Sequence, residues 1–156
     1  MPYRSVGMVR VQHKGKVMKD MANGNVRLQL RDKVAIDGGS YAKAAEQIVK
    51  TAKNKGRDSW FEQLSMSKLR GIYSLITNVY TRVNKPEDFE GNVGDLQYIK
   101  VKMAYESGRE RMVKDFLGST GLMTALDNVK TYDQFILYCR YAESLVAYFK
   151  FYGGKE

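Results

Sequence analysis

The stretch Leu64 to Val83, LSMSKLRGIYSLITNVYTRV, decides the fold class, because its apolar residues recur with the spacing of an α-helix. The apolar positions are Leu69, Ile72, Tyr73, Ile76, Val79, Tyr80 and Val83. They follow the i, i+3, i+4, i+7 pattern that sets one stripe of side chains against a core. The stretch therefore predicts an amphipathic helix that ends at the NKP break around Pro86.

The start of this helix carries charges of unexpected sign. Lys68 and Arg70 lie in the first turn, where the macrodipole and the unpaired N–H groups favour acidic residues. Each cation there should lower helix stability by a few tenths of a kcal/mol. Cations combined with free N–H groups would, however, form a site for an anion such as phosphate.

The apolar spacing is helical almost throughout residues 40–156. Besides the first stretch, it predicts helices at about 40–55, 95–117, 122–128 and 131–153. Ser40 is expected as an N-cap, and Thr131 with Gln134 reads as a capping box. The predicted fold class is an all-α, compact bundle of about five helices with a basic N-terminal extension.

Residues 1–39 are predicted to form a basic N-terminal arm, separate from a helical bundle domain of residues 40–156. The segment NVRLQLRD alternates for a few residues as a short strand would, and ANGN is a turn signal. A hairpin and an extended arm both remain open. The chain start lacks the apolar region of a signal peptide, and no apolar run is long enough to cross a membrane, so we expect a cytoplasmic protein.

The sequence contains little that points to catalysis. It lacks the phosphate-loop, dinucleotide-binding and nucleophile-elbow motifs, and it has one cysteine, Cys139, and one histidine. Cys139 lies within an apolar helical pattern and is expected to be a core residue. The acidic residues Glu87, Asp88, Glu90 and Asp95 either form a solvated loop or hold a divalent cation. We expect no enzymatic activity, no metal and no cofactor.

Positive charge is concentrated in the N-terminal part of the chain. The net charge is +9, with +5 in residues 1–39 and +4 in residues 40–70. This asymmetry indicates a polyanionic partner such as nucleic acid, although an ordinary basic surface remains an alternative. Four cations, Lys43, Lys50, Lys53 and Arg57, are predicted to form a row on and just beyond the first helix, as in proteins that follow a phosphate backbone.

Two further cations lie among apolar residues of the predicted 95–117 helix. At 100° per residue, Lys102 and Arg109 fall between two apolar flanks, one of Val101, Tyr105, Met112 and Phe116 and the other of Ile99, Val113 and Leu117. Glu143 falls within the apolar stripe of the last helix. We infer that Arg109 and Glu143 form a partly buried pair between these helices. Removal of one partner from such a pair would cost roughly 3 to 5 kcal/mol.

Four of the eleven tyrosines flank the stripe of the last helix, namely Tyr138, Tyr141, Tyr148 and Tyr152. Such tyrosines stack on nucleobases, pack with the ring inside and the hydroxyl at the rim, or form interfaces between copies of the chain.

Three motifs occur in a familiar order: LSMSKLRGIYSLI, then LQYIKVKMAYESGR, then YAESLVAYFKFYGG. Together they resemble the small-subunit family of type III-A CRISPR interference (Csm) complexes, over about residues 40–156. The resemblance implies a non-catalytic helical subunit, present in several copies, that contacts the backbones of crRNA and target RNA. Its other partners would be neighbouring copies of itself, the large signature subunit and the backbone subunits.

By position, Lys68, Arg70, Lys102 and Arg109 match basic motif positions of that family. The resemblance thus makes Arg109 an RNA contact, whereas the helical wheel makes it a structural partner of Glu143. We expect Lys68 and Arg70 to hold phosphate without regard to base identity, because an A-form duplex presents mainly shape, 2′-hydroxyls and phosphates. The alternative function is a protein-interaction bundle whose basic face binds partner subunits rather than RNA.

Overall fold

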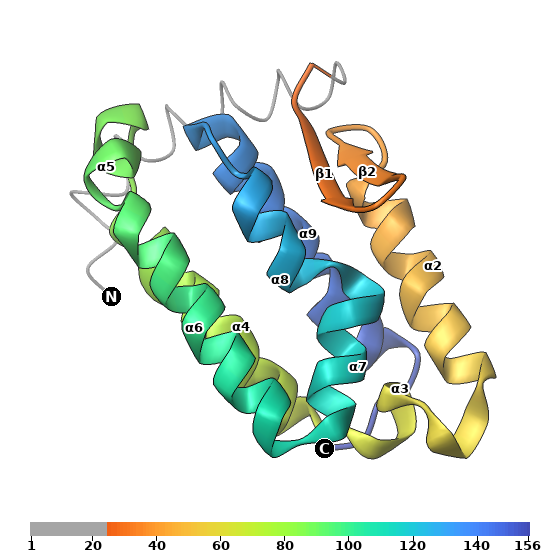
Figure 1. The fold of residues 1–156 in the computed structure, drawn as a ribbon. Coiled ribbons are helices and arrows are strands. Elements are labelled where there is room, and N and C mark those ends of the chain that lie inside the picture. The colour runs from red at the N-terminus through yellow and green to blue at the C-terminus, as the bar shows by residue number, and fades with distance from the viewer. Residues whose placement is uncertain (1–24) are drawn as a thin grey trace.

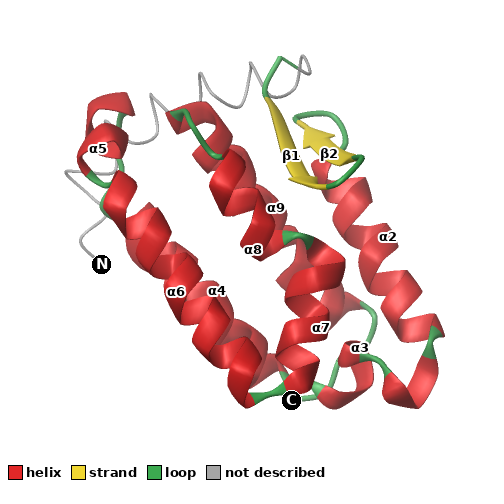
Figure 2. Ribbon diagram, in the orientation of Figure 1, coloured by secondary structure: helices red, strands yellow, loops and turns green. Residues whose placement is uncertain are grey.

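The computed structural model describes residues 25–156, which form a mostly helical body with a small two-stranded hairpin (Figures 1 and 2). Helical residues account for 73% of the described chain, and about six of the helices are substantial. The elements are β1 (Arg27–Arg31), β2 (Val34–Asp37), α2 (Tyr41–Asn54), the 3-10 helix η1 (Gly56–Asp58), α3 (Trp60–Gln63), α4 (Met66–Tyr80), α5 (Pro86–Gly91), α6 (Val93–Arg109), α7 (Arg111–Thr120), α8 (Leu122–Ala125), the 3-10 helix η2 (Leu126–Asn128) and α9 (Tyr132–Phe151).

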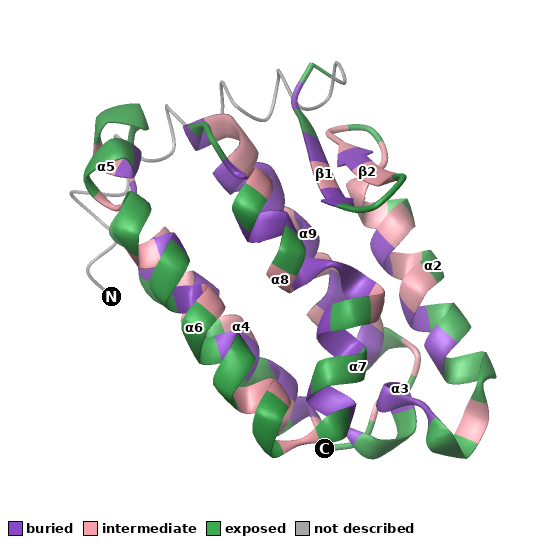
Figure 3. Cartoon of the chain, viewed as in Figure 1, coloured by how far each residue is buried: buried purple, intermediate pink, exposed green. Residues whose placement is uncertain are grey.

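Helix α9 is the centre of the fold, because it packs against both α2 and α4. Its buried residues occur on nearly every side of the helix and include Phe135, Tyr138, Tyr141 and Phe149. A helix that is apolar all round must be surrounded by other elements. Figure 1 shows α4 with α6 on one side of α9 and α2 with the hairpin on the other, and Figure 3 shows the buried residues gathered on the inner surfaces.

The segment that alternates in the sequence forms an antiparallel hairpin, which was one of the two structures left open. Leu28 pairs with Ile36 in the register of β1 and β2, and Lys33 takes a positive φ of 62° in the turn. Leu28, Leu30 and Ile36 are almost completely buried. Residues 27–37 thus contribute side chains to the same core as the helices, while the first 24 residues of the predicted arm lie outside the described part of the chain.

The outer edge of β1 is covered by side chains from the helical body. Asn128 Nδ2 donates to the carbonyl of Gln29 at 2.9 Å, and Gln134 Nε2 donates to that of Arg27 at 3.0 Å. The hydroxyl of Thr124 donates to the carbonyl of Leu30. A two-stranded sheet is marginally stable alone and has exposed edges, so these bonds fix the hairpin to α8, η2 and α9.

The predicted helix over residues 95–117 is wrong as a single element. Glu110 is extended, with φ of −141° and ψ of 115°, and it separates α6 from α7. The two helices bury different faces: Leu96, Ile99 and Met103 on α6, but Met112, Val113, Phe116 and Leu117 on α7. One straight helix could not bury both sets, and the glycine before Arg109 weakens the helix near the break.

The break between the predicted helices at 95–117 and 122–128 falls at Gly121, which ends α7 and precedes α8. Gly121 has a φ of 74°, and a Cβ added there would lie 2.9 Å from the Cβ of Leu30. A glycine is therefore needed for two reasons, the left-handed backbone and the approach of β1. The acidic segment read as a loop forms α5 instead, beginning with Pro86 in its first turn.

Candidate nucleic-acid interface

Helix α2 presents the first three cations of the predicted row, Lys43, Lys50 and Lys53, and all three are exposed. Arg57 follows in η1 and is also exposed. Ala45, Val49 and Ala52 are buried on the opposite side of α2, so the packing of this helix fixes which side the lysines occupy. The described row is about 15 Å long from Lys43 to Lys53, at 1.5 Å per residue.

The single carboxylate of α2 forms no ion pair with these lysines. Glu46 accepts a hydrogen bond from the hydroxyl of Tyr152, next to the C-terminus. Lys53 Nζ donates to the carbonyl of Tyr152 at 2.9 Å and lies 6.0 Å from the ring centre of Phe61. Lys53 therefore joins α2 to the end of α9, whereas Lys43 and Lys50 extend from the surface.

The start of α4 is capped, which changes the interpretation of its two cations. Ser65 is the N-cap, and its hydroxyl accepts from the backbone N–H of Lys68 at 3.1 Å. The backbone N–H of Met66 donates to the carbonyl of Lys155 at 2.7 Å. Because these two N–H groups already have acceptors, the expectation of a first turn with free N–H groups is wrong for them.

The ammonium of Lys68 is held by carboxylates of the α6–α7 junction. Lys68 Nζ lies 3.3 Å from Glu106 Oε1 and 3.7 Å from Glu110 Oε1. The Lys68 side chain is 31% exposed, so it remains accessible from solvent. Arg70 is exposed on α4. The hydrogen bond and the charge of Lys150 lower the pKa of Glu156, and the charge of Arg70 adds to this effect.

A groove runs between α4 and α6. Three adjoining hollows that share lining residues make it up, and its cations are Arg82, Lys102, Lys68 and Lys155. Arg82 is neutralised by Asp95 at 3.0 Å, as Lys68 is by Glu106. The groove is thus of mixed charge, with Lys102 at its middle.

The outer side of α6 carries the last two predicted cations. Lys102 and Arg109 are exposed, and each lies beside a tyrosine one turn earlier. Lys102 Nζ is 5.5 Å from the ring centre of Tyr98, and Arg109 Cζ is 5.6 Å from that of Tyr105. These distances fit cation–π contacts.

The predicted pair between Arg109 and Glu143 is wrong. Arg109 Nη1 lies 3.6 Å from Glu106 on its own helix, and Glu143 lies 3.6 Å from Arg140 on α9. The helical wheel failed because it continued one straight axis through Glu110. Tyr105 is 62% exposed although the wheel placed it with the buried Met112.

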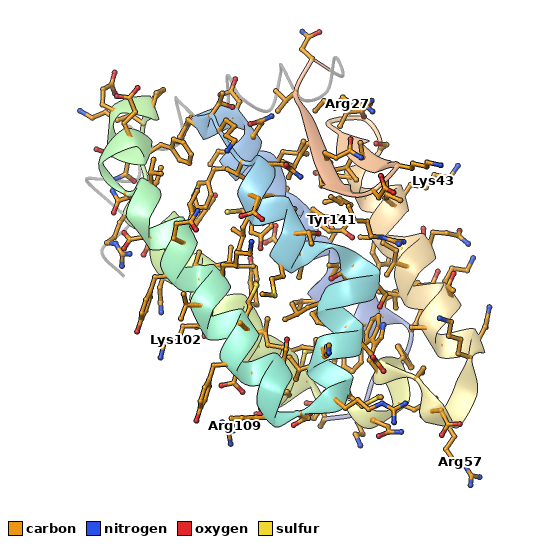
Figure 4. All side chains as sticks on the ribbon, viewed as in Figure 1. Arg27, Lys43, Arg57, Lys102, Arg109 and Tyr141 are labelled. Atoms are coloured by element: carbon orange, nitrogen blue, oxygen red, sulfur yellow. The ribbon has the colours of Figure 1, made fainter. Side chains whose placement is uncertain are left out.

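The structure places the predicted cations on two separate edges. Figure 4 labels Lys43 and Arg57 on the side of α2, and Lys102 and Arg109 on the side of α6. Helix α9 and the α7–α8 segment lie between these sides (Figure 1). Lys68 and Arg70 come from α4, next to α6.

Sequence reasoning missed four cations near the α2 row. Arg27, Arg31 and Lys33 of the hairpin and Lys55 at the end of α2 are exposed, and Arg31 shares a hollow with Lys55. Arg27 lies above Lys43 in Figure 4. The alternation in NVRLQLRD was the available signal, since Arg27 and Arg31 must face away from Leu28 and Leu30.

Two of the four flanking tyrosines are structural. Tyr138 and Tyr141 are completely buried, and their hydroxyls donate to the carbonyls of Leu122 at 2.7 Å and Thr120 at 2.6 Å. For these two tyrosines, packing is the alternative that holds, and they are not available to stack on bases. Cys139 is also buried, as expected of a core residue.

Within residues 25–156, no group of three or more His, Cys, Asp or Glu side chains is arranged to hold a metal ion. In the same part of the chain, no helix has the length and apolar character needed to span a membrane.

Comparison with known proteins gives the family. Residues 42–155 match the family model described as Csm2 Type III-A. The chain belongs to the Csm2 family, the small subunit of the type III-A CRISPR Csm complex. The match agrees with the resemblance read from the three motifs.

Similar curated proteins include the CRISPR system Cms protein Csm2 of Streptococcus thermophilus, 34% identical over 117 residues, covering 75% of this chain and 94% of that protein. The Csm2 protein of Enterococcus italicus is 41% identical over 125 residues, covering 75% of this chain and 89% of that protein. The Csm2 protein of Mycobacterium tuberculosis is 32% identical over 123 residues, covering 74% of this chain and 94% of that protein.

The Csm2 match includes all eight predicted cations, from Lys43 to Arg109. It begins after the hairpin, so Arg27, Arg31 and Lys33 lie outside it. The hairpin is thus an addition to the matched region that nevertheless packs on its core.

Proposed function

We propose that this Csm2-family chain is a non-catalytic subunit that holds the RNA backbone of the type III-A complex without sequence specificity. The RNA would be the guide, the target or both, and the main contact is the α2 row of Lys43, Lys50, Lys53 and Arg57. The observation that carries most weight is that, within residues 25–156, these four exposed cations form no ion pair with a carboxylate. Exposed cations that no ion pair holds are free to contact phosphates.

The two cationic edges support a bridging role. One RNA strand or partner subunit can lie along α2 while another surface faces Lys102 and Arg109 on α6. Of the α4 cations, Arg70 is exposed and serves as a phosphate contact, whereas Lys68 must first leave Glu106 and Glu110. Copies of the chain and the other subunits of the complex are its protein partners.

The test removes three charges from α2 and η1 in the variant Lys43→Gln, Lys50→Gln, Arg57→Gln. Its matched control is Arg82→Gln, Lys100→Gln, Lys150→Gln, which removes the same charge from residues paired with Asp95, Asp127 and Glu156. Equilibrium binding is measured for a guide–target RNA duplex, a duplex of scrambled sequence, single-stranded RNA and a DNA duplex, over a salt series.

We expect equal binding to both RNA sequences and a slope of log affinity against log salt that falls by about 2 to 3 units in the α2 variant, at somewhat under one unit per phosphate contact. The control should change the slope much less. Equal losses in both variants would mean that only net charge matters. If wild type binds no RNA at low salt, the basic face serves protein partners, which is the alternative function.

A further inference from the structure

Helix α6 exposes an unusual amount of large apolar surface. Five large apolar residues of the described chain are exposed, and four lie on α6: Val93 at 47%, Tyr98 at 60%, Val101 at 61% and Tyr105 at 62%. Tyr98, Val101 and Tyr105 follow one another at spacings of three and four, so they share one face. Single exposed apolar residues are common, but a row of them indicates a contact surface.

Two cations complete this row. Lys102 follows Tyr98 by four residues and Arg109 follows Tyr105 by four, and each cation lies against its tyrosine ring. We call Tyr98, Val101, Lys102, Tyr105 and Arg109 the α6 stripe. Along the helix it alternates aromatic and cationic side chains.

The acidic neighbours of the stripe are already paired. Asp95 pairs with Arg82 across the groove, and Glu106 pairs with Lys68 as well as with Arg109. Among the described residues Lys102 has no carboxylate partner and Arg109 shares Glu106 with Lys68, so the stripe keeps positive charge that a negatively charged partner would complement. A second copy docked symmetrically through the same face would bring the same cations together, which is unfavourable.

We propose that the α6 stripe stacks unpaired nucleobases of an RNA strand, with Tyr98 and Tyr105 as the platforms and Lys102 and Arg109 near the phosphates. This inference rests on the proposed RNA-binding function and adds a second, chemically different contact to it. Flat bases and phosphates are complementary to exposed aromatic rings interleaved with cations.

Unpaired nucleotides fit the stripe better than a duplex does. Tyr98 and Tyr105 are separated by about 10 Å along the helix, at 1.5 Å per residue. This is about three times the roughly 3.4 Å between successive nucleotides of a stacked duplex strand. Bases inside a duplex also cover each other's faces, so only splayed bases can lie on both rings.

The test compares Tyr98→Leu, Tyr105→Leu with the control Tyr98→Phe, Tyr105→Phe, which keeps both rings. Both positions are exposed, so the fold should be retained, which circular dichroism and thermal unfolding check. The probes are an oligouridylate, an abasic ribose–phosphate strand with the same number of phosphates, and an RNA duplex. Molar mass in solution is measured for each variant.

Wild type and the Phe variant should bind the oligouridylate more tightly than the abasic strand, by about tenfold per ring, since stacking contributes 1 to 3 kcal/mol per base and 1.4 kcal/mol is tenfold. The Leu variant should lose that preference and keep its affinity for the duplex.

If wild type binds the oligouridylate and the abasic strand equally, the stacking role is overturned. The proposed function still stands in that case, provided that duplex binding persists and depends on the α2 cations. A fall in molar mass in the Leu variant with unchanged RNA binding would instead assign the stripe to contacts between copies. Absence of all RNA binding by wild type would overturn the proposed function as well.

Discussion

The ammonium of Lys68 lies 3.3 Å from the carboxylate of Glu106, on a helix that begins 27 residues later in the chain than α4 does. This pair explains the cation in the first turn of α4, where the macrodipole opposes it. The carboxylates of Glu106 and Glu110 compensate the charge across the helix boundary. The unfavourable local position of Lys68 is thus offset by a tertiary contact.

Glu106→Gln should increase RNA affinity, because it leaves Lys68 with only the more distant Glu110, at 3.7 Å, and removes one repulsive charge beside Arg109. We expect the slope of log affinity against log salt to increase by about one unit. The matched control is Asp127→Asn, which removes one carboxylate paired with Lys100. Equal gains in both variants would show that net charge, rather than release of Lys68, governs binding.

Gly121→Ala should destabilise the fold by about 1 to 3 kcal/mol, the usual cost of a strained backbone residue. Its φ is 74°, and the added Cβ would lie 2.9 Å from that of Leu30. Gly71→Ala is the opposite control, since a Cβ there meets nothing within 4 Å inside α4, and it should stabilise by about 1 kcal/mol. Urea unfolding measures both. A neutral Gly121→Ala would contradict the tight packing of β1 on the α7–α8 junction.

Tyr141→Phe should lower the free energy of unfolding by about 1 to 3 kcal/mol, because the carbonyl of Thr120 loses a buried donor. That carbonyl lies at the end of α7, where no helical N–H remains to bind it. Tyr98→Phe on the exposed face of α6 should change stability by less than about 0.5 kcal/mol. Similar effects of the two substitutions in denaturant unfolding would argue against the buried hydrogen bond.

The phenol of Tyr152 should lose its proton at a higher pH than an ordinary tyrosine does. Its hydrogen bond to Glu46, followed by partial burial and the Glu46 charge, raises the pKa of Tyr152 from 10.0 to about 12. The folded state therefore favours the neutral phenol, and its stabilising contribution is complete below pH 10 and is lost as pH rises towards about 12.

The near-ultraviolet absorbance titration of wild type minus that of Tyr152→Phe isolates this group. Glu46→Gln should move the Tyr152 step to lower pH, because it removes the carboxylate acceptor. A step at the ordinary tyrosine pKa in wild type would refute the contact between α2 and the chain end.

The sequence by itself determined the helices whose apolar stripes are long and regular, because a periodic stripe specifies both the helix and the face that it buries. The α4 stripe from Leu69 to Val79 is buried as predicted, and the hydroxyl of the predicted cap Thr131 accepts from the N–H of Gln134. Ser40 stands at the predicted N-cap position of α2, but its hydroxyl accepts from the N–H of Asp37 instead. The three motifs likewise sufficed for the family, since they are local patterns in a fixed order.

Other features depend on long-range contacts, and only the tertiary structure reveals them. The break at Glu110 depends on which neighbours α6 and α7 each face, so a single helical wheel placed Tyr105 inside and Arg109 beside Glu143. The hairpin is held by side chains about 100 residues away, such as Asn128 on Gln29, as no local pattern indicates. Lys43 and Lys68 are both lysines on predicted helices, yet Lys68 is paired with Glu106, because availability for binding depends on what the fold brings near each charge.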